Sequence, residues 1–323
     1  MSKYTNIAVI LAGGVGSRFG GDALYHGENR SRGAHISYYV TIDKKEKINK
    51  KDKDKKKDDE KIEDEKDIAK VKWDSITTKI YDGDRLIRTL KQKAPKETGI
   101  HKTRWFMAEK GVDRPSRTIR KNSREPRGVT VKPGTYKVVM SFGDQTSETN
   151  ITVKDDPRIN VSSSNTNEVY TTLKALEGMQ KTAAEAVKQL VESKNVASDY
   201  SKTLAKLDKK KYKDQIKASK EISKKIDSLI AVYIGKVDKR QGITRNPEIT
   251  VTQRLGAAGQ YVGSSQNGIT STETTLIKHA ENELKSALEK TNTFFYNEWK
   301  PYQTEMEALN VSPFKDIKSF KID

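Results

Sequence analysis

The stretch that decides the fold of the first half of the chain is PGTYKVVMSFGDQTSETNITV, residues 133–153. Apolar residues recur at every second position before Gly143-Asp144, a dipeptide that favours a tight turn. Successive side chains of a strand point to opposite faces, so one face of the first arm collects the apolar residues. These residues are Tyr136, Val138, Met140 and Phe142. The stretch therefore predicts a β-hairpin with one face in a core.

Shorter alternating runs precede this hairpin. They are GAHISYYVTID (33–43), SITTKIY (75–81), RLIRTLK (85–91) and GIHKTRWFM (99–107). The second and third runs flank Asp82-Gly83-Asp84, which is typical of a hairpin turn; the two carboxylates also raise a metal-site alternative. In the last run we expect Trp105 and Met107 to share a face. Six strands with this spacing predict an immunoglobulin-like antiparallel β-sandwich over residues 23–158.

The periodicity becomes helical after residue 158. Three sets of apolar residues recur at three- and four-residue steps. They are Leu173, Leu176, Met179, Ala183, Val187 and Leu190; Ile216, Ile222, Ile226, Leu229 and Tyr233; and Ile277, Ala280, Leu284, Leu288, Phe295 and Trp299. A shorter helix is expected from Glu248 to Val262, between a proline and a turn-rich stretch. These stripes could each bind a partner helix or a membrane surface, but an antiparallel helical bundle over 159–323 buries all of them at once. The predicted class is thus α+β and multidomain.

The charge is unevenly distributed along the 323 residues, whose formal net charge is +18. The insert at 44–70 holds 12 lysines against 10 acidic residues, so we expect a solvated mixed-charge segment. The larger excess lies at 102–132, with 10 basic against 3 acidic residues. Because no aromatic residues alternate with these charges to stack bases, the pattern favours a solvated loop over an anion site, and nucleic acid is not the favoured partner.

Composition also excludes several kinds of site. Cysteine is absent, which excludes disulfides, thiolate metal sites and cysteine nucleophiles. The four histidines lie far apart in sequence, and no pair has the spacing of metal ligands. No apolar run has the 18 or so residues that a membrane-spanning helix needs. The chain lacks a G-x-S-x-G elbow, and its acidic residues suggest no glycosidase pair. We therefore assign no catalytic and no metal-binding residue.

The opening NIAVILAGGVGSRFGGD, residues 6–22, follows a different pattern, that of a strand, a phosphate-cradling loop and a helix start. The segment LAGGVGSRFG resembles the N-terminal motif of cytidylyltransferases of the isoprenoid and ribitol-phosphate type. The resemblance implies CTP and magnesium as cofactors. It also implies a nucleotide loop made of Ala12, Gly13, Gly14, Gly16 and Arg18.

The same opening departs from that family immediately afterwards. No Pro-Lys pair follows Gly20, and nothing downstream alternates strands with helices as a parallel α/β sheet requires. We therefore interpret residues 1–22 as a nucleotidyltransferase-like segment rather than a complete domain. The alternatives are an added strand at residues 7–11, or a secretory signal whose apolar core is shorter than usual.

From about residue 24 onward the chain resembles the C-terminal region of bacterial sortilin-like, BNR-repeat β-propeller proteins, which are often labelled glycosyl hydrolases. The resemblance rests on LYHGENRSRGAHISYYV, IYDGDRLIRTL, GIHKTRWFM, VKPGTYKVVMSFGDQTSETNITVKDDPRI and MEALNVSPF. In that family an immunoglobulin-like sandwich of the flagellar hook-capping type follows the propeller, and a helical segment ends the chain. The propeller is absent here.

This second resemblance implies an extracellular or cell-surface location and a non-catalytic structural or interaction role. It also implies a protein or cell-surface partner and no cofactor. A surface that once faced a propeller would be apolar and exposed, so self-association is expected. A cytidylyltransferase-like enzyme using residues 11–20 remains the alternative hypothesis.

Overall fold

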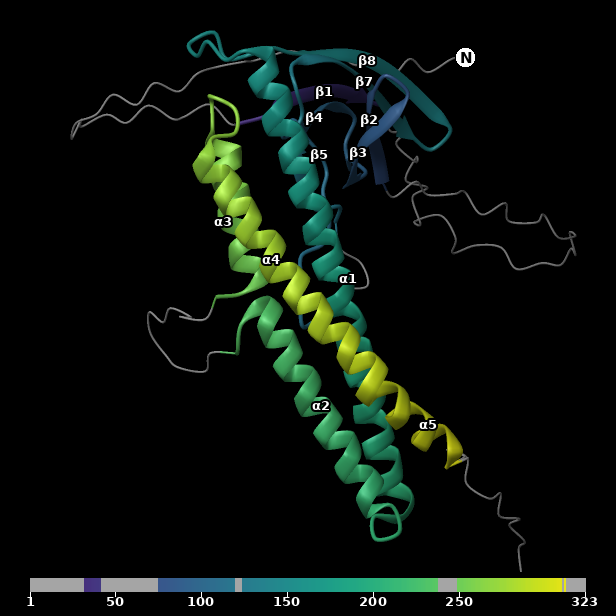
Figure 1. Cartoon of the computed structure of the whole chain (residues 1–323). Helices are drawn as coiled ribbons and strands as arrows, with labels where there is room; N and C mark the ends of the chain where they lie inside the picture. The colour runs from purple at the N-terminus through teal and green to yellow at the C-terminus, as the bar shows by residue number, and fades with distance from the viewer. Residues whose placement is uncertain (1–31, 42–74, 120–123, 238–248, 310, 312–323) are drawn as a thin grey trace, which may run out of the picture. The chain divides into compact units, whose positions relative to one another are not determined.

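The computed structural model describes residues 32–41, 75–119, 124–237, 249–309 and 311 (Figure 1). Its fold is α+β, with antiparallel sheets followed in sequence by helices. The described residues form two compact units. The first holds the described residues within 32–110 and 130–156, and the second holds those within 111–129 and 157–311. The helical periodicity, which starts after residue 158, thus begins next to Pro157, where the C-terminal part of the second unit starts.

The larger sheet has four antiparallel strands in the order β3-β2-β7-β8. The strands are β2 (Ser75–Asp82), β3 (Arg85–Lys93), β7 (Gly134–Phe142) and β8 (Gln145–Val153). Both predicted hairpins are confirmed, and each turns on a two-residue Gly-Asp loop. The first residues of these loops, Gly83 and Gly143, have φ of 59° and 58°. Glycine takes such values without the steric penalty that a Cβ brings, so the Gly-Asp pairs set the pairing next to each turn; in the β2–β3 pair the register then shifts between Ile80 and Tyr81.

The smaller sheet pairs β1 (Ala34–Val40) with β4 (Gly99–Trp105) in antiparallel register. Alternation along β1 buries Ile36, Tyr38 and Val40. These side chains share one apolar core with residues of the larger sheet. Its members there are Ile76, Ile80, Ile87, Tyr136, Val138, Met140 and Ile151. The face predicted for the 133–153 hairpin is therefore a core face.

The strand predicted for GIHKTRWFM, residues 99–107, ends earlier than expected, at Trp105. β4 ends at the buried Trp105, and Met107 has φ of 52°, so strand alternation stops there. Met107 nevertheless packs against the same core as Trp105. Two further short strands, β5 (Ala108–Lys110) and β6 (Arg127–Thr130), lie in the stretch predicted as a basic loop. The loop prediction for 102–132 is therefore wrong at these residues.

The predicted helices are confirmed. They are α1 (Ser163–Asp208), α2 (Lys213–Ile234), α3 (Val251–Ser264) and α4 (Ser271–Phe294), which continues through a π-helical turn η1 (Phe295–Trp299) into α5 (Lys300–Ala308). The N-cap hydroxyls of Thr250 and Thr270 form capping boxes with Gln253 and Glu273, which satisfy amides that the first helical turn leaves without partners. These caps fix where α3 and α4 begin.

The apolar stripes of the helices meet in a single core. Its most deeply buried members include Val187 and Leu190 of α1, Ile226 and Tyr233 of α2, and Ala280 of α4. The three stripes expected from the sequence therefore pack against one another. None of the helices in the described part of the chain is long and apolar enough to cross a membrane.

Candidate functional site

The nucleotide loop expected from the opening stretch lies outside the described residues. This holds for Ala12, Gly13, Gly14, Gly16 and Arg18 alike, and for the charged insert at 44–70. The cytidylyltransferase hypothesis, with CTP and magnesium, therefore stays a prediction. The candidate sites that follow come from the described residues only.

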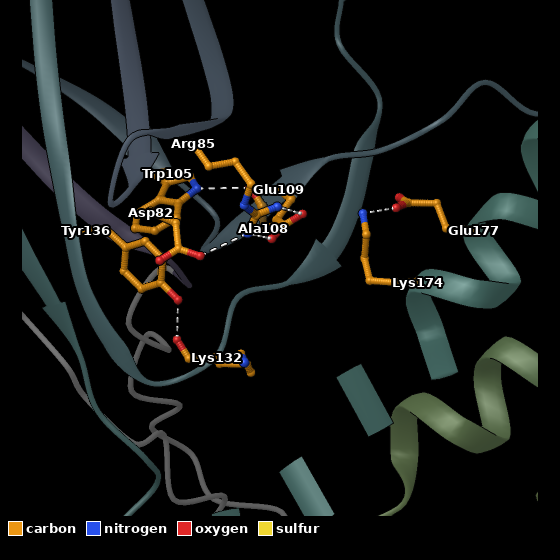
Figure 2. A network of polar contacts seen from close by, with 9 residues as sticks. All are labelled: Asp82, Arg85, Trp105, Ala108, Glu109, Lys132, Tyr136, Lys174 and Glu177. Carbon is orange, nitrogen blue, oxygen red and sulfur yellow. Dashed lines mark hydrogen bonds and ion pairs between the residues drawn. The ribbon is translucent and has the colours of Figure 1, made fainter. Parts of the chain in front are cut away.

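The first candidate is a network of charges around Arg85, at the start of β3 (Figure 2). The Nη2 atom of Arg85 donates to Glu109 Oε1 at 2.8 Å and to Asp82 Oδ2 at 2.9 Å. The side chain of Glu109 is only 5 % exposed, whereas that of Arg85 is 52 % exposed. Arg88 Nη1 also donates to the backbone oxygen of Glu109 at 3.3 Å. A buried carboxylate needs a counter-ion, so this network holds β5 against β3.

A metal site at Asp82 and Asp84 was the alternative to a hairpin turn. Asp82 is bound to Arg85, and Gly83 between the two aspartates forms the hairpin turn. Within the described ranges, no three acidic, histidine or cysteine side chains come together as a metal-binding group. Asp84 lies in the turn, whereas Asp82 is the last residue of β2 and pairs with Arg85.

Two large aromatic side chains in the sheet unit have buried rings, and their polar atoms donate hydrogen bonds to backbone carbonyl oxygens. The hydroxyl of Tyr136 donates to the carbonyl oxygen of Lys132 at 2.6 Å, and Trp105 Nε1 donates to that of Ala108 at 3.0 Å (Figure 2). Their rings meet edge to face with centroids 5.5 Å apart. Such pairs join the two sheets and leave their polar atoms satisfied.

The helical unit buries two polar pairs of its own. The hydroxyls of Tyr233 and Thr291 lie 2.8 Å apart, and those of Ser219 and Tyr302 lie 2.9 Å apart. Burial raises the pKa of both tyrosines above the ordinary value. Both phenols therefore stay protonated near neutral pH, and their hydrogen bonds link α2 to α4 and α5.

Part of the basic stretch packs on the helices. A Cβ added at Gly128 would lie 2.8 Å from Glu177 Oε1, and Glu177 also forms an ion pair with Lys174 (Figure 2). Arg117 donates to the carbonyl oxygen of Gly235, the residue that caps α2. The expectation of a wholly solvated loop is therefore wrong for these residues.

Sequence reasoning missed one surface, the connection between α1 and α2. The segment KTLAKLDKKKYKDQIKASK, residues 202–220, holds eight lysines against two aspartates and is called the basic turn below. All eight lysine side chains are exposed. Asp208 Oδ1 accepts hydrogen bonds from the backbone N of Lys210 at 2.9 Å and of Lys211 at 3.0 Å. The run Lys209-Lys210-Lys211 is the sequence signal for this surface.

The buried polar side chains described above hold elements together, and the basic turn carries a dense group of exposed lysines. Comparison of the chain with protein-family models, with curated proteins and with solved structures finds no match.

Proposed function

We propose that the chain is a non-catalytic structural and interaction protein. It consists of an immunoglobulin-like β-sandwich followed by an antiparallel helical bundle, as in the region after the propeller of bacterial sortilin-like, BNR-repeat proteins. It acts outside the cell or at the cell surface, on a protein or cell-surface partner and without a cofactor.

The strand pairing supports the sandwich. In immunoglobulin-like domains strand B pairs with E in one sheet, while C′, C, F and G are neighbours in the other. Taken in chain order, β1 corresponds to B, β2 to C, β3 to C′, β4 to E, β7 to F and β8 to G. This assignment reproduces the β1–β4 pair and the order β3-β2-β7-β8.

The hydrogen bond from Tyr136 to Lys132 is the observation that carries the proposal. Immunoglobulin-like domains have a tyrosine near the start of strand F whose hydroxyl bonds to the backbone a few residues upstream. Tyr136 lies near the start of β7 and bonds four residues back. Two residues further on, where antibody domains place a cysteine, stands Val138, which is 1 % exposed. Apolar packing takes the place of the disulfide.

The hydrogen bonds made by the buried polar side chains described above support a non-catalytic role. Glu109 is held by Arg85, Tyr136 by the backbone of Lys132, and Tyr233 by Thr291. Groups used in this way hold elements together, whereas a catalytic acid or base must reach a substrate. Function then belongs to the surfaces of the sandwich and the bundle.

Isothermal titration calorimetry tests this proposal against the cytidylyltransferase alternative. CTP with magnesium is titrated into the full chain, into Arg18→Ala and into Arg114→Ala, which removes an exposed positive charge elsewhere. We expect no binding heat in any of the three. Micromolar binding by the wild type that is lost only in Arg18→Ala would overturn the proposal in favour of the enzyme.

A further inference from the structure

We propose that the basic turn binds the surface of an anionic lipid bilayer. The inference rests on the helical unit alone and does not depend on the proposed function. It concerns residues 202–220, where α1 ends at Asp208 and α2 begins at Lys213.

The basic turn concentrates charge at the end of two packed helices. Eight lysines and two aspartates give it a formal charge of +6, a third of the net charge of the whole chain. Among the described residues, none forms an ion pair with Lys209 or Lys210. Clusters of four to eight basic residues beside a helix are a pattern that anionic bilayers attract, because each positive charge near the surface adds to the binding free energy.

The backbone of the turn is fixed, so the lysines are presented together. Asp208 accepts two backbone hydrogen bonds across the turn, and these bonds lower the pKa of its carboxyl. Beneath the turn, Leu204 and Ile216 are buried in the helical core. Figure 1 shows the connection as a short loop at one end of the adjacent helices α1 and α2. The run Lys209 to Lys211 lies in this connection and can meet a flat surface, whereas Lys202 and Lys217 on the helices also pair with Asp199 and Glu221.

An apolar side chain accompanies the charge. Leu207 is 43 % exposed and directly precedes Asp208 in the last turn of α1. Peripheral membrane segments combine basic residues with an apolar side chain that enters the headgroup region. Tyr212 is half-buried, with Lys211 Nζ 5.1 Å from the centre of its ring, so this aromatic residue is engaged within the protein.

The composition of the turn favours a bilayer over nucleic acid. All eight basic residues are lysine and none is arginine. Arginine supplies the planar, bidentate contacts that dominate recognition of bases and phosphates, whereas lysine is a hydrated point charge suited to a diffuse anionic surface. Single-strand binding also relies on exposed aromatic rings for stacking, and the turn's one aromatic residue is Tyr212.

The decisive experiment is co-sedimentation of the full chain with vesicles of phosphatidylglycerol and phosphatidylcholine, compared with vesicles of phosphatidylcholine alone. We expect binding to the anionic vesicles only, and loss of that binding as salt rises from about 0.1 M to about 1 M, where screening becomes short-ranged. Each lysine near the surface strengthens binding about five-fold. The variant Lys209→Gln/Lys210→Gln/Lys211→Gln should therefore bind about 100-fold more weakly.

A matched variant separates the basic turn from the charge of the whole chain. Lys278→Gln/Lys285→Gln/Lys290→Gln removes the same charge from exposed positions on α4 and should change binding less than about five-fold, the contribution of a single lysine. The turn variant keeps the hydrogen bonds of Asp208, since these use backbone N–H groups. A second turn variant, Lys206→Gln/Lys213→Gln/Lys220→Gln, should lose binding by a similar factor, so the test does not depend on one variant folding.

Three results would overturn the proposal. The first is absence of binding to the anionic vesicles at low salt. The second is an equal loss of binding in the turn and α4 variants, which would assign the effect to net charge. The third is tighter binding of a single-stranded oligonucleotide than of vesicles at the same phosphate concentration, with the turn variants losing the oligonucleotide, which would make nucleic acid the partner.

Discussion

The hydroxyl of Tyr136 donates a 2.6 Å hydrogen bond to the carbonyl oxygen of Lys132, while the ring packs edge to face on the buried Trp105. One residue thus ties the chain entering β7 to the core that both sheets share. Tyr136→Phe keeps the ring and removes the bond, and should cost about 1 kcal/mol of the free energy of unfolding.

Amide hydrogen exchange of peptides from β7 and β8 measures this cost within the sheet unit. Tyr39→Phe is the control, because Tyr39 is 36 % exposed and its change should stay within about 0.5 kcal/mol. Equal protection of β7 in wild type and Tyr136→Phe would show that the bond contributes nothing to stability.

The Arg85 network predicts a larger cost for losing Arg85 than for losing the exposed carboxylate of Asp82. Arg85→Ala removes the two hydrogen bonds that Arg85 donates to the carboxylate of Glu109, whose side chain is 5 % exposed, and should cost about 1–3 kcal/mol. Asp82→Asn removes only an exposed ion pair and should cost less than about 1 kcal/mol. Urea unfolding followed by hydrogen exchange of β3 compares them. A larger effect from Asp82→Asn would mean that the buried pair is not what holds β5.

Two glycines of the helical unit should respond to alanine in opposite directions. A Cβ at Gly128 would lie 2.8 Å from both Glu177 Oε1 and the backbone of Gly111, so Gly128→Ala should destabilise by about 1–3 kcal/mol. A Cβ at Gly178, inside α1, would meet nothing within 4 Å. Gly178→Ala should stabilise by about 0.5–1 kcal/mol, because alanine loses less backbone entropy in a helix. Thermal unfolding of both variants checks the signs, and a neutral Gly128→Ala would argue against close packing of the basic stretch on α1.

The buried tyrosines predict loss of stability in alkali. Burial raises the pKa of Tyr233 in the folded state, so the unfolded chain ionises first as the pH rises through about 10. The stabilisation from the protonated phenol is complete below the unfolded pKa and is lost as the pH rises through the folded pKa. The slope for one proton is at most about 1.4 kcal/mol per pH unit. Urea unfolding between about pH 9 and pH 11 should show a smaller slope for Tyr233→Phe than for wild type, and identical slopes would contradict the assignment.

Local patterns made much of the fold predictable. The alternation in residues 133–153 and the Gly-Asp loops at Gly83 and Gly143 are properties of a few neighbouring residues, and they placed both hairpins. The helical stripes were equally predictable, because buried residues recur on one face over many turns of α1, α2 and α4. In these elements the apolar residues that recur with the period of the strand or helix are the residues that the fold buries.

Contacts between distant residues escaped prediction. β5 has three residues, of which Glu109 and Lys110 are charged, so it shows no apolar periodicity; the burial of Glu109 is accompanied by hydrogen bonds from Arg85, 24 residues upstream. The packing of Gly128 against Glu177 likewise joins a stretch that reads as solvated to a helix about 50 residues away. The bond from Tyr136 to Lys132 could have been suspected from a tyrosine just inside a strand, but its geometry follows only from the fold.

The most direct test of the proposed function is an experimental structure of the full chain grown with CTP and magnesium. We expect β1 paired with β4, the order β3-β2-β7-β8, the bond from Tyr136 to Lys132, and no nucleotide at Ala12, Gly13, Gly14, Gly16 and Arg18. A parallel sheet that includes residues 6–11, with CTP bound at the glycine-rich loop, would contradict the account and identify the chain as a nucleotide-using enzyme.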